Sequence, residues 1–319
     1  MHRTGAAWRS PQLEASGMAS ESLSRIVTRR IPFDFPQDVK PHWIPDKPEL
    51  AHLWNGASMT MPYLEPFLIR TMREALKQVQ DPVVHADGEA FISQEGQHYR
   101  VHRRFNDQLI ASGGYTELAA VEAQMEVFYA KLSTRSLGCR LAFSAGFESM
   151  TMGMTRWLIG ERCKLFKDAD PRVVSFVLWH MVEETEHKTV AFDVYQTLYG
   201  NYWQRMFGVL HGSYGVLNFG VRACVLMLKK DGLWKGWRSR WKFFAQGVTA
   251  VRHIGPYLLR AMLPWHDPRA ERDLEWVREW LARFPADVAD GSIPMVDTRD
   301  PLMPVPSMTV KSNEVSYGT

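Results

Sequence analysis

The sequence predicts an all-α protein with a ferritin-like four-helix bundle, a crossover helix and extra C-terminal helices. Between about residues 58 and 283, apolar residues recur at helical spacing in successive segments that are broken by Gly, Pro and Asp. Alternating period-2 patterns are almost absent, and we find no internal repeat. With 319 residues and 45% hydrophobic composition, the chain is long enough to bury a sizeable core.

Composition narrows the classes of function and compartment. The formal net charge of +3 is small for this length, so the sequence predicts no nucleic-acid partner. The three cysteines, Cys139, Cys163 and Cys224, form no CxxC or metal-knuckle pattern. We therefore expect a protein of the reducing cytoplasm.

Three regions follow from the composition along the chain. Residues 1–25 are rich in Ser, Gly and Arg and lack the apolar core of a signal peptide, so they are expected to form a disordered lead. Met18 is an alternative start of the protein. Residues 26–283 are expected to form a single helical metal-binding domain, and the Pro-rich residues 284–319 an irregular strap and tail.

The first long helix is expected over 58–80, with Ser58 or Thr60 as its N-cap. Pro66 should kink this helix or delay its start, because its ring blocks the hydrogen bond to the residue four positions back. The 87–114 helix is expected to begin at Asp87, and the fifth helix at Asp170 and Pro171. The four later helices are predicted at 87–114, 115–136, 137–166 and 170–200.

Two of these helices carry a Glu-x-x-His pair, and two others can each contribute one inward-facing Glu, which together form the ligand set of a dinuclear carboxylate site in a four-helix bundle. Residues three apart lie above one another on one helix face, so both side chains can reach one ion. Glu65 precedes Glu95 by 30 residues and Glu148 precedes Glu184 by 36, which suits facing antiparallel helices. The 115–136 helix would be the crossover. The predicted metal ligands, with no separate catalytic residue, are Glu65, Glu95, His98, Glu148, His180, Glu184 and His187.

Several other residues compete with these ligands. Glu183 is the main rival of Glu184, and Glu122 or Glu126 could replace one ligand if the bundle is assembled differently. His102 is expected either to support a ligand or to lie on the surface. The additional pair Glu49-Leu50-Ala51-His52 follows Pro48 without a preceding long helix, and we interpret it as a chance match or as a helix-start residue.

The stretches "FISQEGQHYRVHRRFN", "EETEHKTVAFDVY" and "YLLRAMLPWHDP" resemble a bacterial family known as predicted metal-dependent hydrolases, over about Arg30 to Asp267. The pattern of His180, Glu184 and His187 also resembles the di-iron arylamine N-oxygenases, which add a third histidine to the usual ligands. That likeness is limited to the ligand pattern. Pro66 departs from what such helices normally contain. The resemblance implies a ferritin-like di-iron site, although the family name implies hydrolysis.

Mixed carboxylate and imidazole ligands suit iron or manganese, so two iron ions are expected, with manganese as the alternative. The predicted function is that of a non-haem di-iron oxygenase, which uses O₂ and an electron donor to oxidise a hydrophobic small molecule or lipid. The third histidine favours this oxygen chemistry. The alternatives are a dinuclear metal-dependent hydrolase, because two ions can also activate water, and a site for metal storage or structure.

An apolar segment at 206–221 is shorter than a membrane-spanning helix and precedes a stretch, 229–244, that interleaves basic residues with Trp and Phe. Such a composition is typical of the lipid headgroup region, so 206–244 is a candidate for peripheral contact with the inner membrane. It is also compatible with ordinary Trp-rich packing. The sequence leaves a homodimer open.

Overall fold

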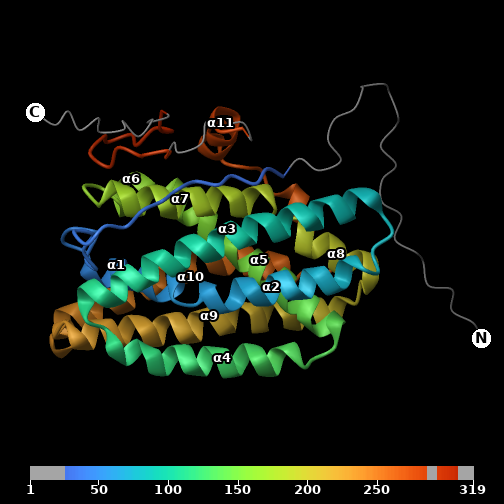
Figure 1. Ribbon diagram of the computed structural model, residues 1–319, viewed down its shortest axis with the longest axis horizontal. Helices are drawn as coiled ribbons and strands as arrows, with labels where there is room; N and C mark the ends of the chain where they lie inside the picture. The colour runs from blue at the N-terminus through green and yellow to red at the C-terminus, as the bar shows by residue number, and fades with distance from the viewer. Residues whose placement is uncertain (1–25, 286–292, 308–319) are drawn as a thin grey trace, which may run out of the picture.

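The computed structural model describes residues 26–285 and 293–307, and the fold of these residues is all-α, as predicted (Figure 1). The expected lead at 1–25 lies outside the described residues, as do 286–292 and 308–319. The helices run mostly parallel or antiparallel to the long axis of the molecule, which gives a helical bundle (Figure 1).

The centre of the bundle is formed by α2 (Met61–Leu76), α3 (Pro82–Gly113), α5 (Leu137–Gly160) and α7 (Pro171–Glu186) with its continuation α8 (Val190–Leu198). Helix α2 packs against α3, α5 packs against α7 and α8, and α2 also contacts α5. This pairing brings together the four helices that carry the predicted ligands.

Several helix ends follow directly from capping residues. The Asp81 side chain accepts hydrogen bonds from the backbone N–H groups of Val83 and Val84, so α3 begins there and not at the predicted Asp87. The Asp170 and Pro171 start of α7 agrees with the prediction, because Asp170 accepts from the N–H of Arg172. Helix α3 ends where Gly114 adopts φ +62°, a left-handed conformation that glycine tolerates best.

Several of the predicted helices are interrupted in the structure, and the predicted 137–166 helix divides into α5 and the short α6 (Arg162–Leu165). The 58–80 segment begins with the end of α1 (Pro48–Ser58), and α2 starts at Met61, so Pro66 lies inside a helix that it neither ends nor delays. The predicted 170–200 helix breaks after Glu186, and His187 is the C-cap residue of α7 at φ −101°. Short breaks of this kind leave the periodicity of the sequence almost unchanged.

The predicted crossover corresponds to α4 (Ala119–Ser133), which packs against α2 and α9 (Figure 1). Helices α9 (Tyr202–Lys230) and α10 (Trp237–Ala261) form an outer layer on α5. A Cβ atom on Gly208 would lie 2.0 Å from the carbonyl oxygen of Ala142, so the backbones of α9 and α5 touch. This contact fixes the position of α5, which carries Glu148.

None of the helices in the described part of the chain is long and apolar enough to cross a bilayer.

The described segments that follow residue 25 and precede residue 308 lie across α7 as irregular straps (Figure 1). At the C-terminal side, α11 (Glu275–Arg283) is followed by residues 293–307, where the carbonyl oxygen of Met303 accepts hydrogen bonds from Trp276 and Arg162. At the N-terminal side, Arg29 is buried and donates a hydrogen bond to the carbonyl oxygen of Phe284. The two straps therefore cover the side of α7 that faces away from α5.

Candidate metal centre

The structure brings all seven predicted ligands together in the middle of the bundle, and each is at most 3% exposed. Four helices contribute. Helix α2 supplies Glu65, α5 supplies Glu148, and α3 and the end of α7 supply the remaining residues, which are Glu95, His98, His180, Glu184 and His187.

The ligands fall into two groups in which the potential ligand atoms lie within 4.8 Å of one another. One group contains Glu65, His98 and His180. The second group contains Glu95, Glu148, Glu184 and His187. When two ligand atoms bind one ion at right angles, with bonds of about 2.1 Å, the two ligand atoms lie about 3 Å apart. Separations of this order between ligand atoms therefore fit binding to the same ion.

Two carboxylates lie between these groups. Glu95 Oε1 is 3.7 Å from His98 Nδ1 and 3.5 Å from His187 Nε2. Glu184 places Oε1 2.8 Å from His180 Nε2 and Oε2 3.2 Å from His187 Nε2. Glu95 and Glu184 are therefore positioned to bridge two ions, while Glu65 and Glu148 lie at opposite ends.

The donor atoms at the centre of the cluster are buried and lack hydrogen-bond partners. Both carboxylate oxygens of Glu65, Glu95 and Glu148 are in this state, and so is His98 Nδ1. Buried polar atoms are normally satisfied, because leaving a carboxylate unpaired away from water is costly. Their convergence on one point fits a metal centre. The four carboxylates also carry the charge that two divalent cations would neutralise.

The pKa shifts reflect how closely these buried ionisable groups are packed. Burial and the neighbouring Glu95 raise the pKa of Glu65 well above its ordinary value. Burial, with the charge of Glu184, raises the pKa of Glu148 to about 8. Burial would lower the pKa of His98, but contacts with Glu183 and Glu95 outweigh it and raise the pKa to about 10.

Neighbouring side chains fix the orientation of two of the histidines. Nε2–H of His98 donates to Glu183 Oε2 at 3.1 Å, which leaves Nδ1 facing the cluster. Glu183 is itself paired with Arg29. Nδ1 of His187 donates to Gln94 Oε1 at 2.9 Å, so its Nε2 faces the carboxylates. Hydrogen bonds of this kind set the ligating nitrogen in known metal sites.

The third histidine, His180, is oriented by a chain of hydrogen bonds that ends on α1. Asn106 Nδ2 donates to the backbone oxygen of Ser58, so its Oδ1 accepts from the Ser58 hydroxyl. Ser58 has one proton, so it must accept from His102 Nδ1, which leaves His102 Nε2 without a proton. That nitrogen accepts from His180 Nδ1 at 2.9 Å. The network thereby assigns a free lone pair to His180 Nε2, the atom that faces Glu184.

The pKa directions agree with this assignment. Burial lowers the pKa of His102 well below its ordinary value, and the nearby His180 and His98 add to the effect. Burial, followed by the charge of His98, also lowers the pKa of His180. Both rings are therefore neutral near pH 7, and a neutral imidazole is the form that binds a metal.

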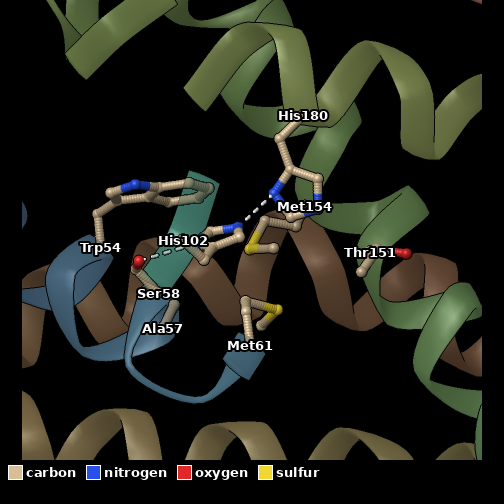
Figure 2. A pocket seen from close by; sticks show the side chains of 8 residues that line it. All are labelled: Trp54, Ala57, Ser58, Met61, His102, Thr151, Met154 and His180. Carbon is tan, nitrogen blue, oxygen red and sulfur yellow. Dashed lines mark hydrogen bonds between the residues drawn. The ribbon is translucent and has the colours of Figure 1, made fainter. Parts of the chain in front are cut away.

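A small cavity beside His102 and His180 has room for about one water molecule (Figure 2). Figure 2 shows His102 pointing toward His180 on one side and hydrogen-bonded to Ser58 on the other. The rest of the lining is mostly apolar and is contributed by Trp54, Ala57, Met61, Thr151 and Met154. The cavity therefore lies beside the His180 side of the centre, between α1 and α5.

The competing candidates lie outside the cluster. Glu183 contacts His98 from behind and does not face the centre. Glu122 accepts a hydrogen bond from the Tyr63 hydroxyl, and Glu126 is exposed. His102 is buried and supports His180, which is the first of its two expected roles.

Sequence reasoning missed the residues that orient the ligands. Arg29, Ser58 and Gln94 are buried polar residues that contact Glu183, His102 and His187, respectively, and the buried Asn106 is hydrogen-bonded to Ser58. For Gln94 and Asn106 a weak indication was available, because they stand on the same helix as Glu95 and His98. Nothing in the sequence pattern points to Arg29 or Ser58.

His52, from the pair that was interpreted as a chance match or a helix-start residue, belongs to a group of close polar atoms. His42 and His52 Nε2 lie 2.6 and 2.7 Å from Asp231 Oδ2. Asn55 Oδ1 accepts from Trp43, so its Nδ2 donates to His52 Nδ1, and His52 must carry its proton on Nε2. That proton points at Asp231. The group is thus a hydrogen-bonded clamp between α1 and the end of α9, and Glu49 does not take part in it.

Fold and cluster together define a helical protein with two adjoining groups of carboxylate and histidine residues, each of which could hold a metal ion. The chain matches the family model described as predicted metal-dependent hydrolase over residues 27–272, and it belongs to this family. Comparison with curated proteins and with solved structures found no significant match. The chain is therefore a member of a metal-dependent enzyme family.

Proposed function

We propose that this protein is a di-iron enzyme that uses O₂ and an electron donor to oxidise a hydrophobic small molecule, with manganese as the alternative metal. The observation that carries the proposal is the pair of ligand groups joined by Glu95 and Glu184. This ligand set, with one Glu-x-x-His pair on each of two helices, is typical of di-iron and di-manganese carboxylate proteins of the ferritin-like class.

Iron bound there would supply electrons to O₂, and the chain's own residues provide the setting for that chemistry. Glu65, His98 and His180 would hold one ion, Glu148 and His187 the other, and Glu95 with Glu184 both. The bundle excludes water, because the ligands are almost fully buried. The Ser58 hydroxyl holds the proton of His102 on Nδ1 and so keeps His180 Nε2 available as a ligand.

Two features favour oxidation of an apolar molecule. The three imidazoles supply more nitrogen ligands than the usual two, and nitrogen ligands suit iron. The cavity beside His180 has room for about one small molecule and is lined mainly by apolar side chains, which suits O₂ better than a charged ester or phosphate.

The second candidate function is metal-dependent hydrolysis, which the description of the family favours. Two ions held by the same ligands could lower the pKa of a bound water and polarise a carbonyl or phosphoryl oxygen. The choice between the two functions therefore depends on whether the reaction consumes O₂.

The test begins with metal analysis of protein produced with abundant iron. The proposal expects two irons per chain and consumption of O₂ when the reduced protein is mixed with an oxygenated buffer. Glu184→Gln should lose both properties. Glu126→Gln, which removes an exposed carboxylate from α4, should keep them.

Two other results would contradict the proposal. Hydrolysis of ester or phosphate substrates without O₂ or reductant, lost in Glu184→Gln, would establish the second candidate. Uptake of many irons per chain with deposition of mineral would indicate storage in place of catalysis.

A further inference from the structure

Helix α10 presents an exposed apolar row on the side opposite its contacts with the protein. Trp237, Trp241 and Phe244 are 69%, 63% and 59% exposed, and Val251 is 69% exposed. With Val248 they follow alternating spacings of four and three residues, which places them along one face of the helix. The buried residues of this helix, Ser239, Tyr257 and Ala261, lie on the other face. The apolar row therefore points away from the core.

The helix before it repeats this arrangement. Along α9, exposed large hydrophobic residues also follow spacings of four and three, and α9 leads into α10 through residues 231–236. The row on α9 consists of Trp203, Phe207, Leu210, Tyr214, Leu217 and Val221. Contiguous exposed apolar surface of this kind usually marks an interaction site.

Positive charge is concentrated on the same two helices. Between Asn201 and His266 the only carboxylate in the sequence is Asp231. The same segment contains ten basic residues, which are Arg205, Arg222, Lys229, Lys230, Lys235, Arg238, Arg240, Lys242, Arg252 and Arg260. The whole chain carries a formal charge of only +3, so the remainder of the molecule is net acidic. All of these basic residues except the buried Arg205 are exposed, so the positive charge is concentrated on this part of the surface.

On α10 the basic residues flank the apolar row. By helical geometry, Arg240 lies on one side of the row and Arg252 on the other, about 60° away in each case, and Arg238 lies about 100° away. All three are exposed. An apolar row containing Trp and Phe, bordered by cations, is the pattern of a helix that lies in the interface of an anionic bilayer.

A second copy of the chain is a poorer occupant for this face. Coiled-coil pairing would also use spacings of four and three, but its flanking positions normally carry charges of both signs. Helix α10 contains no carboxylate, so two copies would bring basic residues against basic residues. An anionic lipid surface complements both the apolar row and the cations.

We propose that α10 docks this protein on anionic lipid bilayers, with Trp237, Trp241 and Phe244 inserted among the headgroups and Arg238, Arg240 and Arg252 near the phosphates. This docking proposal does not depend on which reaction takes place at the metal centre. It would hold the protein at the membrane surface and does not require a spanning helix.

The test is co-sedimentation of the full chain with vesicles of phosphatidylcholine, with and without an equal part of phosphatidylglycerol. Binding is expected with the anionic vesicles at low salt, and it should be largely lost in about 0.5 M salt because the charges are screened. Arg238→Gln, Arg240→Gln and Arg252→Gln together should weaken binding by roughly a hundredfold, since each cation contributes about a fivefold gain near such a surface. Arg70→Gln, Arg73→Gln and Lys77→Gln remove the same charge from α2 and should have little effect.

The apolar contribution is tested separately. Trp241→Ser with Phe244→Ser should weaken binding by about tenfold or more, whereas Val127→Ser with Leu302→Ser changes exposed apolar residues elsewhere and should not. All of these side chains are exposed, so circular dichroism should show unchanged folding. Three results would overturn the proposal: no binding to anionic vesicles, equal binding to neutral vesicles at all salt concentrations, or a dimer in solution that Trp241→Ser dissociates.

Discussion

Replacing Glu183 by Gln tests whether this carboxylate orients His98 for metal binding. The Glu183 carboxylate accepts from His98 Nε2 at 3.1 Å and pairs with Arg29, but it does not face the ligand cluster. In Glu183→Gln the amide oxygen can still accept from His98, and the negative charge behind the ring is lost. Glu184→Gln, by contrast, removes an anionic ligand that contacts both His180 and His187.

The magnitudes follow from these positions. Mutation of a residue that orients a metal-bound histidine costs about 10–100-fold in metal affinity. At a fixed free metal concentration, that corresponds to about 1.4–2.7 kcal/mol less metal-dependent stability. If metal at about 1,000 times its Kd stabilises the wild-type protein by about 4 kcal/mol, Glu183→Gln should retain part of this gain. Glu184→Gln should retain almost none.

The assay is anaerobic titration of the metal-free protein with Fe²⁺ or Mn²⁺ in competition with a chelator, followed by thermal unfolding with and without metal. Chelation should lower the Tm of the wild type, and the shift should be smaller by roughly 3–8 °C in Glu183→Gln. Glu126→Gln is the matched control. If Glu183→Gln bound no metal while Glu184→Gln bound it normally, Glu183 would be the ligand and the proposed pair of ion sites would be wrong.

Two further predictions concern the frame around the centre. Gly208→Ala places a Cβ atom 2.0 Å from the carbonyl oxygen of Ala142 and should destabilise the fold by about 1–3 kcal/mol. The control is Gly247→Ala, whose Cβ meets nothing within 4 Å and should stabilise the fold by up to about 1 kcal/mol. Equal melting temperatures for both variants would argue against the close contact of α5 and α9. Burial would raise the pKa of Asp231, but hydrogen bonds from His42, His52 and Tyr115 outweigh it and hold the pKa well below its ordinary value. The Asp231 carboxylate therefore stabilises the fold above about pH 4, and this contribution is lost as the pH falls through its folded-state pKa. In urea unfolding, Asp231→Asn should be less stable than the wild type at pH 7 and at pH 5, and the difference should shrink below about pH 4; a difference that grows on acidification would refute this account.

Much of the fold and all seven candidate ligands could be derived from the sequence, because helical periodicity and Glu-x-x-His spacing are local properties. Asp170 and Pro171 also identify a helix start locally, and that prediction is confirmed. The break after Glu186 could not be foreseen, since the apolar periodicity continues through it. Asp81 was overlooked in favour of Asp87, although the pair Asp81-Pro82 is the stronger start.

The remaining features depend on contacts between distant parts of the chain. Arg29 meets Glu183 across 154 residues, and His52 meets Asp231 across 179. Spacing along one helix carries no information about such pairs. For the same reason, the sequence did not predict the contact of His52 with Asp231. The direction of that contact follows from the Asn55 hydrogen bonds, which fix the proton of His52 on Nε2.

The contact between α1 and α9 links the outer layer of the protein to the metal centre. A Cβ atom on Gly56 would lie 2.2 Å from the carbonyl oxygen of Gly220, so the two backbones are already as near as atoms allow. Ser58, two residues further along α1, holds the proton on His102 that keeps His180 in its ligating form. A displacement of α9 toward the bundle must therefore push α1, and the first bonds to lengthen would be those that decide whether His180 can bind a metal.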